Sequence, residues 1–203
     1  MLGKKGVFGA VFGLAMNFAL FLVKLFVSIS SGSLAIYCDG INNLGDTLSC
    51  IIALVGFVLI IRHGEKKSMR IQSLASFVIG LILAFTGAYF AYNGVERMMY
   101  PVAISYLTKY AVLIAVTIIV KALMGIVYYI LNKNSKSPVF KALITDSILD
   151  TVITISALLS LTLSVKINFA IDSIISIAIG TIVCVSAVKT VVSQGKYLIN
   201  DGI

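Results

Sequence analysis

Six apolar stretches dominate this sequence, and each is long enough to cross a lipid bilayer as a helix. A bilayer core of about 30 Å needs about 20 apolar residues in helical form. Backbone amides inside lipid must be satisfied within their own segment, which favours the α-helix. The expected spans run near Val7–Ser28, Leu34–Ile61, Ile71–Val95, Tyr110–Leu131, Val139–Leu163 and Ile171–Val192. We therefore expect an all-α membrane protein with six transmembrane helices.

Composition supports this assignment. Hydrophobic residues make up 60% of the 203 residues and charged residues only 12%, whereas about a quarter of a soluble domain is charged. The links between the stretches are too short for a separate soluble domain, so we expect residues 1–203 to form one six-helix transmembrane domain. The three cysteines lie inside apolar stretches without the spacing of a zinc or disulfide motif, which indicates small packing residues.

The formal net charge of +8 is better explained by basic loops than by nucleic-acid binding. Cytoplasmic loops of membrane proteins are enriched in Lys and Arg. One side of the expected topology carries Lys4, Lys5, Arg62, Lys66, Lys67, Arg70, Lys133, Lys136, Lys141 and Lys196. The other side carries only Arg97, Lys109 and Lys166. This asymmetry predicts that both termini lie in the cytoplasm.

Three further lysines fall inside the apolar stretches. Lys24 and Lys189 lie near the ends of their expected spans, where a long side chain can reach the membrane surface. Lys121 lies deeper in the fourth span, so it is predicted to pair with a carboxylate or to face a wet cavity. The sequence does not identify its partner.

Carboxylates inside the spans are the strongest indication of function. Five of the eight acidic residues lie within or at the ends of expected spans: Asp39, Asp46, Asp146, Asp150 and Asp172. A charged side chain at the bilayer centre costs roughly 3 kcal/mol on insertion scales. A chain that keeps several such groups is expected to use them.

The spacing of these residues predicts a cation site. Asn42 and Asp46 are four residues apart, as are Asp146 and Asp150, so each pair occupies one face of its helix. At about 1.5 Å per residue, Asp46 lies about 18 Å below the outer end of the second span. Asp150 lies at a similar depth from the inner end of the fifth span. Four oxygen donors would therefore meet near the midplane, enough for a tetrahedral cation site. Interhelical hydrogen bonding is the simpler alternative.

Other polar and small residues suggest helix packing. Asn43 is expected to make an interhelical hydrogen bond, whereas Asp39 fits either an exit lining or such a bond equally well. Asp172 is expected in the first turn of the sixth helix, where the helix dipole favours it. Seven glycines are expected at close helix contacts: Gly9, Gly13, Gly80, Gly87, Gly94, Gly125 and Gly180.

The same residues resemble the cation diffusion facilitator family. The stretch "SGSLAIYCDGINNLGD" is similar to that family's second-span pattern, with Cys38 in place of the usual alanine. The stretch "KALITDSILDTVIT" matches its fifth-span [HD]-x-x-x-D motif, and "ERMMYP" and "NFAIDSIISIAIG" extend the likeness over nearly the whole chain. The resemblance implies a transport site at Asn42, Asp46, Asp146 and Asp150.

The resemblance also implies an activity. It implies export of a divalent transition metal from the cytoplasm across the cell membrane by alternating access, commonly in exchange for protons, by a homodimer. Members usually continue into a cytoplasmic ferredoxin-like domain, which would begin at "KYLINDGI", where the sequence stops, so that domain is expected to be absent. The His-rich stretch that many relatives carry after the second span is reduced to "RHGEKKSMR", in which His63 is expected to be a solvated loop residue.

The donor set ranks the candidate metals. Three carboxylates and one amide oxygen suit harder cations such as Mn²⁺, whereas zinc sites favour imidazole or thiolate. Within the family, this set resembles the manganese-associated branch. We expect Mn²⁺ as the cargo, followed by Fe²⁺. Zn²⁺ stays open, because affinity rises from Mn²⁺ toward Zn²⁺ at most divalent sites. No resident cofactor is expected.

Two other function classes fit parts of the sequence. Some membrane phosphotransferases hold metals with helical aspartates, but the further residues of their motif do not follow "DGINNLGD". A non-enzymatic role is therefore expected. A passive divalent-cation channel is harder to distinguish from the sequence, because only a carrier couples its flux to a gradient.

Overall fold

The chain folds into long α-helices. The computed structural model describes the backbone of residues 2–63, 65–135, 138–166 and 170–200, and the side chains of residues 7–55, 69–133, 143–164 and 170–199. The helices are α1 (Leu2–Ser31), α2 (Leu34–His63), α3 (Glu65–Met99), α4 (Thr108–Ser135), α5 (Pro138–Lys166) and α6 (Ala170–Asn200). The all-α prediction is confirmed. The side chain of His63 lies outside the described residues.

Each helix extends beyond its apolar stretch. The third stretch, expected near Ile71–Val95, becomes the 35 residues of α3. Backbone hydrogen bonds continue into polar flanking residues because helix propagation does not require an apolar side chain. Five helices contain a described stretch long and apolar enough to span a membrane: α1, α3, α4, α5 and α6. The described part of α2 carries two aspartates and two asparagines, and its place among its neighbours puts it inside the bundle.

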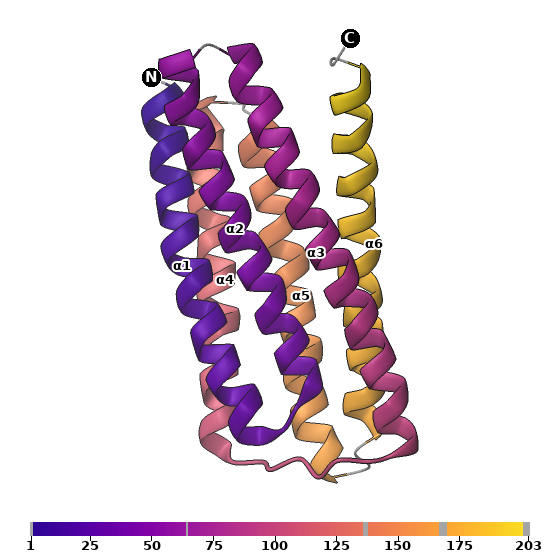
Figure 1. Cartoon of the computed structure of the whole chain (residues 1–203). Coiled ribbons are helices and arrows are strands. Elements are labelled where there is room, and N and C mark those ends of the chain that lie inside the picture. The colour runs from indigo at the N-terminus through magenta and orange to yellow at the C-terminus, as the bar shows by residue number, and fades with distance from the viewer. Residues whose placement is uncertain (1, 64, 136–137, 167–169, 201–203) are drawn as a thin grey trace.

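The helices run lengthwise side by side, and α1 begins at the same end of the bundle at which α6 ends (Figure 1). Helix α1 packs along α2, and α4 packs along α5. Contacts of α1 with α4 and of α2 with α5 join these pairs into a four-helix group. Helix α3 packs most extensively against α6, and this second group meets the first through α2 and α5.

Glycines allow the close approach of α3 and α6. Gly80, Gly87 and Gly94 recur every seven residues along α3. A Cβ atom at Gly87 would lie 2.6 Å from the backbone nitrogen of Cys184 and 2.8 Å from the carbonyl oxygen of Gly180. Small residues permit this backbone contact between membrane helices. The packing role expected of these glycines is confirmed.

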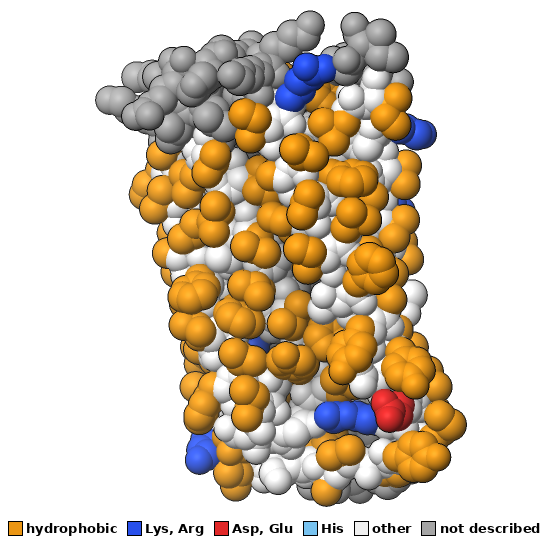
Figure 2. All heavy atoms as spheres, viewed as in Figure 1, with side chains coloured by type: hydrophobic (Ala, Val, Ile, Leu, Met, Phe, Trp, Pro, Cys, Tyr) orange, Lys and Arg blue, Asp and Glu red, His pale blue; other side chains and the backbone are white. Residues whose placement is uncertain are grey.

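The apolar core and the apolar surface lie where a membrane protein needs them. Val27, Ile36, Ile114 and Leu161 are fully buried together, in the half of the bundle away from the two termini. Large hydrophobic side chains such as Phe85, which is 76% exposed, point outward. They cover most of the face in Figure 2, and the charged groups visible there lie mainly toward its two ends.

Candidate metal centre

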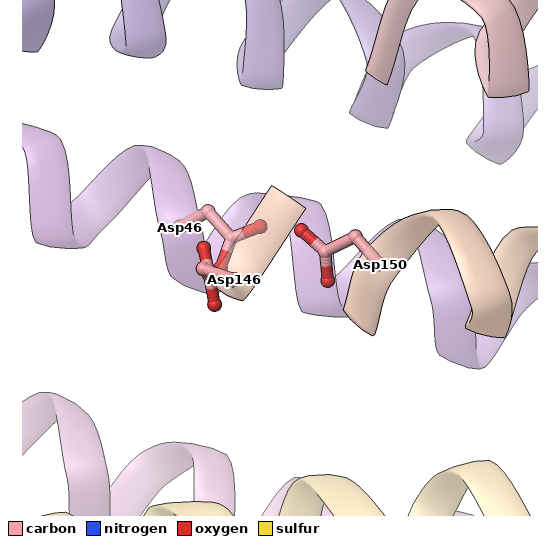
Figure 3. A group of neighbouring side chains, drawn as sticks. All are labelled: Asp46, Asp146 and Asp150. Atoms are coloured by element: carbon pink, nitrogen blue, oxygen red, sulfur yellow. The ribbon is translucent and has the colours of Figure 1, made fainter. Parts of the chain in front are cut away.

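Three carboxylates converge inside the bundle. Asp46 comes from α2, and Asp146 and Asp150 come from adjacent turns of α5 (Figure 3). One carboxylate oxygen from each residue lies within 4.8 Å of the others. The i,i+4 spacing places Asp146 and Asp150 on one face of α5, and that face meets α2. The predicted meeting of the second-span and fifth-span carboxylates is therefore observed.

The three carboxylates differ in solvent exposure. The Asp150 side chain is 2% exposed and that of Asp46 is 16% exposed. Asp146 is exposed and lines, with Asp46, a cavity of about 220 Å³ between α2, α3, α5 and α6. A cation that arrives through this cavity meets Asp146 and Asp46 before it reaches Asp150.

Asn42 adjoins the same group. Its side chain lines the cavity, and its amide nitrogen donates a hydrogen bond to Asp150 Oδ1 at 2.6 Å. An anionic oxygen attracts an N–H donor, so the amide presents nitrogen rather than oxygen to Asp150. Turning the amide about its last bond would present Asn42 Oδ1 instead. All four residues named by the sequence pattern thus lie together.

A lysine bridges two of the carboxylates. Lys121 of α4 places its Nζ 2.5 Å from Asp150 Oδ2 and 3.1 Å from Asp46 Oδ2. The ammonium also donates a hydrogen bond to Asn17 Oδ1 of α1, at 2.6 Å. Lys121 is 1% exposed. The predicted carboxylate pairing of Lys121 is confirmed. Asn17 was not anticipated, although an asparagine in the middle of an apolar stretch is a signal that could have identified it.

The expectation that Lys24 reaches the membrane surface is wrong. Lys24 is 1% exposed, and its Nζ lies 2.8 Å from Asp39 Oδ2. It also donates to Asn43 Oδ1 at 2.7 Å and to Thr154 Oγ1 at 2.8 Å. A buried ammonium with one ion-pair partner and two hydrogen-bond acceptors has no need to reach water. Asp39 and Asn43 thus join helices, which settles Asp39 as an interhelical acceptor and confirms the prediction for Asn43.

This second ion pair is separate from the three carboxylates. Thr154 is one helical turn beyond Asp150 on α5, and Asn43 is about one turn before Asp46 on α2. The group formed by Lys24, Asp39, Asn43 and Thr154, called the Lys24 cluster below, therefore lies about one turn further from the termini than the three carboxylates. The buried apolar cluster around Val27 and Ile36 lies in the same half of the bundle.

The Asp172 carboxylate links the start of α6 to α2 and α5. It lies in the first turn of α6, as predicted. Its carboxylate also accepts a hydrogen bond from Ser33 Oγ at 2.6 Å, from the Leu34 backbone nitrogen at 2.8 Å and from Ser160 Oγ at 2.6 Å. The carboxylate of α6 thus caps the beginning of α2.

A polar cavity lies between the carboxylates and the end of the bundle that carries the termini. A second cavity of about 360 Å³ is lined by Ser73, Gln72, Ser193 and Tyr197, from the beginning of α3 and the end of α6. It shares Ser76 with the cavity that contains Asp46 and Asp146. Hydroxyl and amide groups line both cavities and can replace part of the hydration of a cation.

Comparison with known proteins agrees with this architecture. A family model described as the cation efflux transmembrane domain matches residues 10–199. An uncharacterized transporter from Methanocaldococcus jannaschii is 28% identical over 130 residues, which are 62% of this chain and 46% of the relative. The chain therefore spans less than half the length of that relative. The family match confirms the predicted membrane fold and favours a transporter over the membrane-enzyme alternative.

Proposed function

Because this chain belongs to the cation efflux transmembrane domain family, we propose that it is a transporter that exports a divalent metal ion from the cytoplasm. The proposed metal ligands are Asn42, Asp46, Asp146 and Asp150. The end of the bundle that carries the termini is proposed to face the cytoplasm, supported by the excess of Lys and Arg on that side.

The approach of the three carboxylates carries this proposal. Metal–oxygen bonds of about 2.2 Å place ligand oxygens up to about 4.4 Å apart across one ion. The observed oxygens lie within 4.8 Å of one another. Small side-chain rotations of Asp46, Asp146 and Asp150 would therefore bring all three to a single dication. Three carboxylates gathered inside a membrane repel one another, and a dication removes that repulsion.

Oxygen donors support Mn²⁺ as the preferred cargo. The group offers three carboxylates and the amide of Asn42, and hard oxygen ligands suit Mn²⁺ better than they suit zinc. Fe²⁺ is the next candidate, and Zn²⁺ the third. Discrimination between these ions depends on the geometry of the site, since intrinsic affinity favours Zn²⁺.

Proton exchange follows from the same carboxylates. A carboxylate that ligates metal must be free of protons, so metal binding and protonation exclude one another at Asp46, Asp146 and Asp150. Protons entering from the far side would displace the metal there. Alternating access is proposed to occur by movement of the α3–α6 pair against the four-helix group, with a second copy of the chain completing a homodimer.

Metal uptake into proteoliposomes tests the proposal. Purified protein is reconstituted and supplied with Mn²⁺, Fe²⁺, Zn²⁺ or Mg²⁺, with and without an imposed pH gradient. We expect saturable Mn²⁺ uptake that a gradient of the correct sign accelerates. Asp46→Asn and Asp150→Asn should abolish uptake, whereas Glu96→Gln, the same chemical change at an exposed position on α3, should not.

Three results would contradict parts of the proposal. Uptake by Asp46→Asn and Asp150→Asn at the wild-type rate would refute the assigned ligands. Indifference to the pH gradient would refute proton exchange. A flux that does not saturate and does not couple to any gradient would instead identify a passive channel.

A further inference from the structure

Lys121 places a positive charge between two of the carboxylates that the proposed function assigns to the metal. Its Nζ is within hydrogen-bonding distance of Asp46 Oδ2 and Asp150 Oδ2. An ammonium and a dication cannot share these two oxygens at full strength, because they repel one another across a few ångströms of poorly solvated protein. The lysine and a bound metal therefore compete for Asp46 and Asp150.

The ammonium has a partner outside this competition. Of the three oxygen atoms that it contacts, only Asn17 Oδ1 is uncharged and belongs to a residue outside the proposed ligands. Lysine carries its charge on a flexible four-carbon stem and can pivot between acceptors. Retreat toward Asn17 would free both carboxylates while the ammonium kept one of its hydrogen bonds.

The formal charges also indicate that Lys121 weakens metal binding. With all three carboxylates ionised, they and the ammonium together carry a formal charge of −2, equal and opposite to that of a dication. Three carboxylates without the lysine would bind a dication more tightly and release it more slowly. A transport site must bind its ion strongly enough to load it and weakly enough to let it leave.

We propose that Lys121 is a tethered competitor of the transported metal: it weakens metal binding at Asp46 and Asp150 and speeds metal release, and Asn17 holds its ammonium while the metal is bound. This inference rests on the proposed function of the carboxylates. Lys121 is a positioning residue, since it acts on the metal through the carboxylates.

Two substitutions should act in opposite directions. Lys121→Met removes the competing charge and keeps a side chain of similar length, so the Kd for Mn²⁺ should fall at least about tenfold. Asn17→Leu removes the neutral acceptor and leaves the ammonium dependent on Asp46 and Asp150, so the Kd for Mn²⁺ should rise several-fold. General damage to the fold would weaken binding in both variants.

The Lys24 cluster supplies a matched control. Lys24 is also a buried lysine paired with an aspartate, but it contacts none of Asp46, Asp146 and Asp150. The double variant Lys24→Met/Asp39→Asn removes this ion pair without leaving one charge unpaired. Its Kd for Mn²⁺ should stay within about twofold of wild type.

Titration calorimetry on the full chain in detergent measures the Kd for Mn²⁺. Initial uptake rates in proteoliposomes give KM and kcat. In Lys121→Met we expect KM and kcat both to fall, because tighter binding slows release. An unchanged or raised Kd in Lys121→Met would overturn the inference, as would an unchanged or lowered Kd in Asn17→Leu. If Lys121→Met does not fold, the direction of change in Asn17→Leu decides.

Failure of the inference is distinct from failure of the proposed function. Wild-type protein that binds none of Mn²⁺, Fe²⁺ and Zn²⁺ would refute the function itself. Wild-type protein that binds Mn²⁺ with the same Kd as Lys121→Met would refute only the role of the lysine.

Discussion

Adding one methyl group at Gly87 should separate α3 from α6. The Cβ of Gly87→Ala would lie 2.6 Å from the Cys184 nitrogen, about 0.8 Å short of the 3.4 Å at which ordinary contact begins. Its next neighbours are the Gly180 carbonyl oxygen at 2.8 Å and the Cys184 Cα at 2.9 Å. All three atoms are backbone, so no side-chain rotation relieves the clash and the helices must move apart.

The size of the effect follows from two opposing contributions. Overpacking a tight contact costs about 1–3 kcal/mol, and a contact made only of backbone belongs at the upper end. Replacing glycine by alanine inside a helix returns about 1 kcal/mol of helix propensity. The net loss for Gly87→Ala is therefore about 2 kcal/mol, or a lowering of Tm by about 4–8 °C for a chain of this length.

Gly125→Ala is the matched control. Its Cβ would meet only the Ser147 Cβ, at 3.4 Å, so the propensity gain is not opposed by a clash. Thermal unfolding in detergent, followed by circular dichroism at the helical bands, should show Gly125→Ala at or above the wild-type Tm. A Gly87→Ala variant with the same Tm as Gly125→Ala would refute the inferred backbone contact between α3 and α6.

Three further outcomes are expected. Lys24→Met, which leaves Asp39 buried and unpaired, should lose about 3–5 kcal/mol of stability, measured as a fall in Tm, and Asp39→Asn added to it should recover part of the loss. Asn42→His supplies an imidazole, so the ratio of Zn²⁺ to Mn²⁺ uptake should rise; an unchanged ratio would argue against Asn42 as a ligand. Asp172→Ala removes the cap of Leu34, so thermal stability should fall by at least about 1 kcal/mol, and hydrogen exchange at the first turn of α2 should speed up.

Periodicity and composition were enough to predict the helices and the two polar i,i+4 pairs, Asn42 with Asp46 and Asp146 with Asp150. Apolar length sets where a chain crosses a membrane, and an i,i+4 spacing sets which side chains share a face. The four residues Asn42, Asp46, Asp146 and Asp150 could therefore be placed together before the helix packing was known. Their depths along α2 and α5 put them at one level, because two antiparallel helices bring equal depths to the same level, but depth alone did not show that these two helices are neighbours.

Contacts that depend on which helices are neighbours could not be predicted. Lys24 lies near the end of its apolar stretch, and depth alone suggested that it reaches the surface. The packing of α1 against α2 instead brings Asp39 within 2.8 Å of it. Asn17 was missed for the same reason, since its partner Lys121 belongs to a helix 104 residues away. Sequence spacing describes one helix at a time, whereas these partners come from several.

The capping contacts of Asp172 have a mechanical consequence. They fasten the first turn of α6 to the start of α2 and to Ser160 of α5, so this turn can serve as a fulcrum. At about 1.5 Å per residue, the opposite tip of α6 at Asn200 lies about 42 Å from it. A rotation of about 5° about that turn moves the distal end of the helix by about 4 Å. Slight tilting of the α3–α6 pair about this turn would thus displace the end that carries the serine-lined cavity far more than the anchored end.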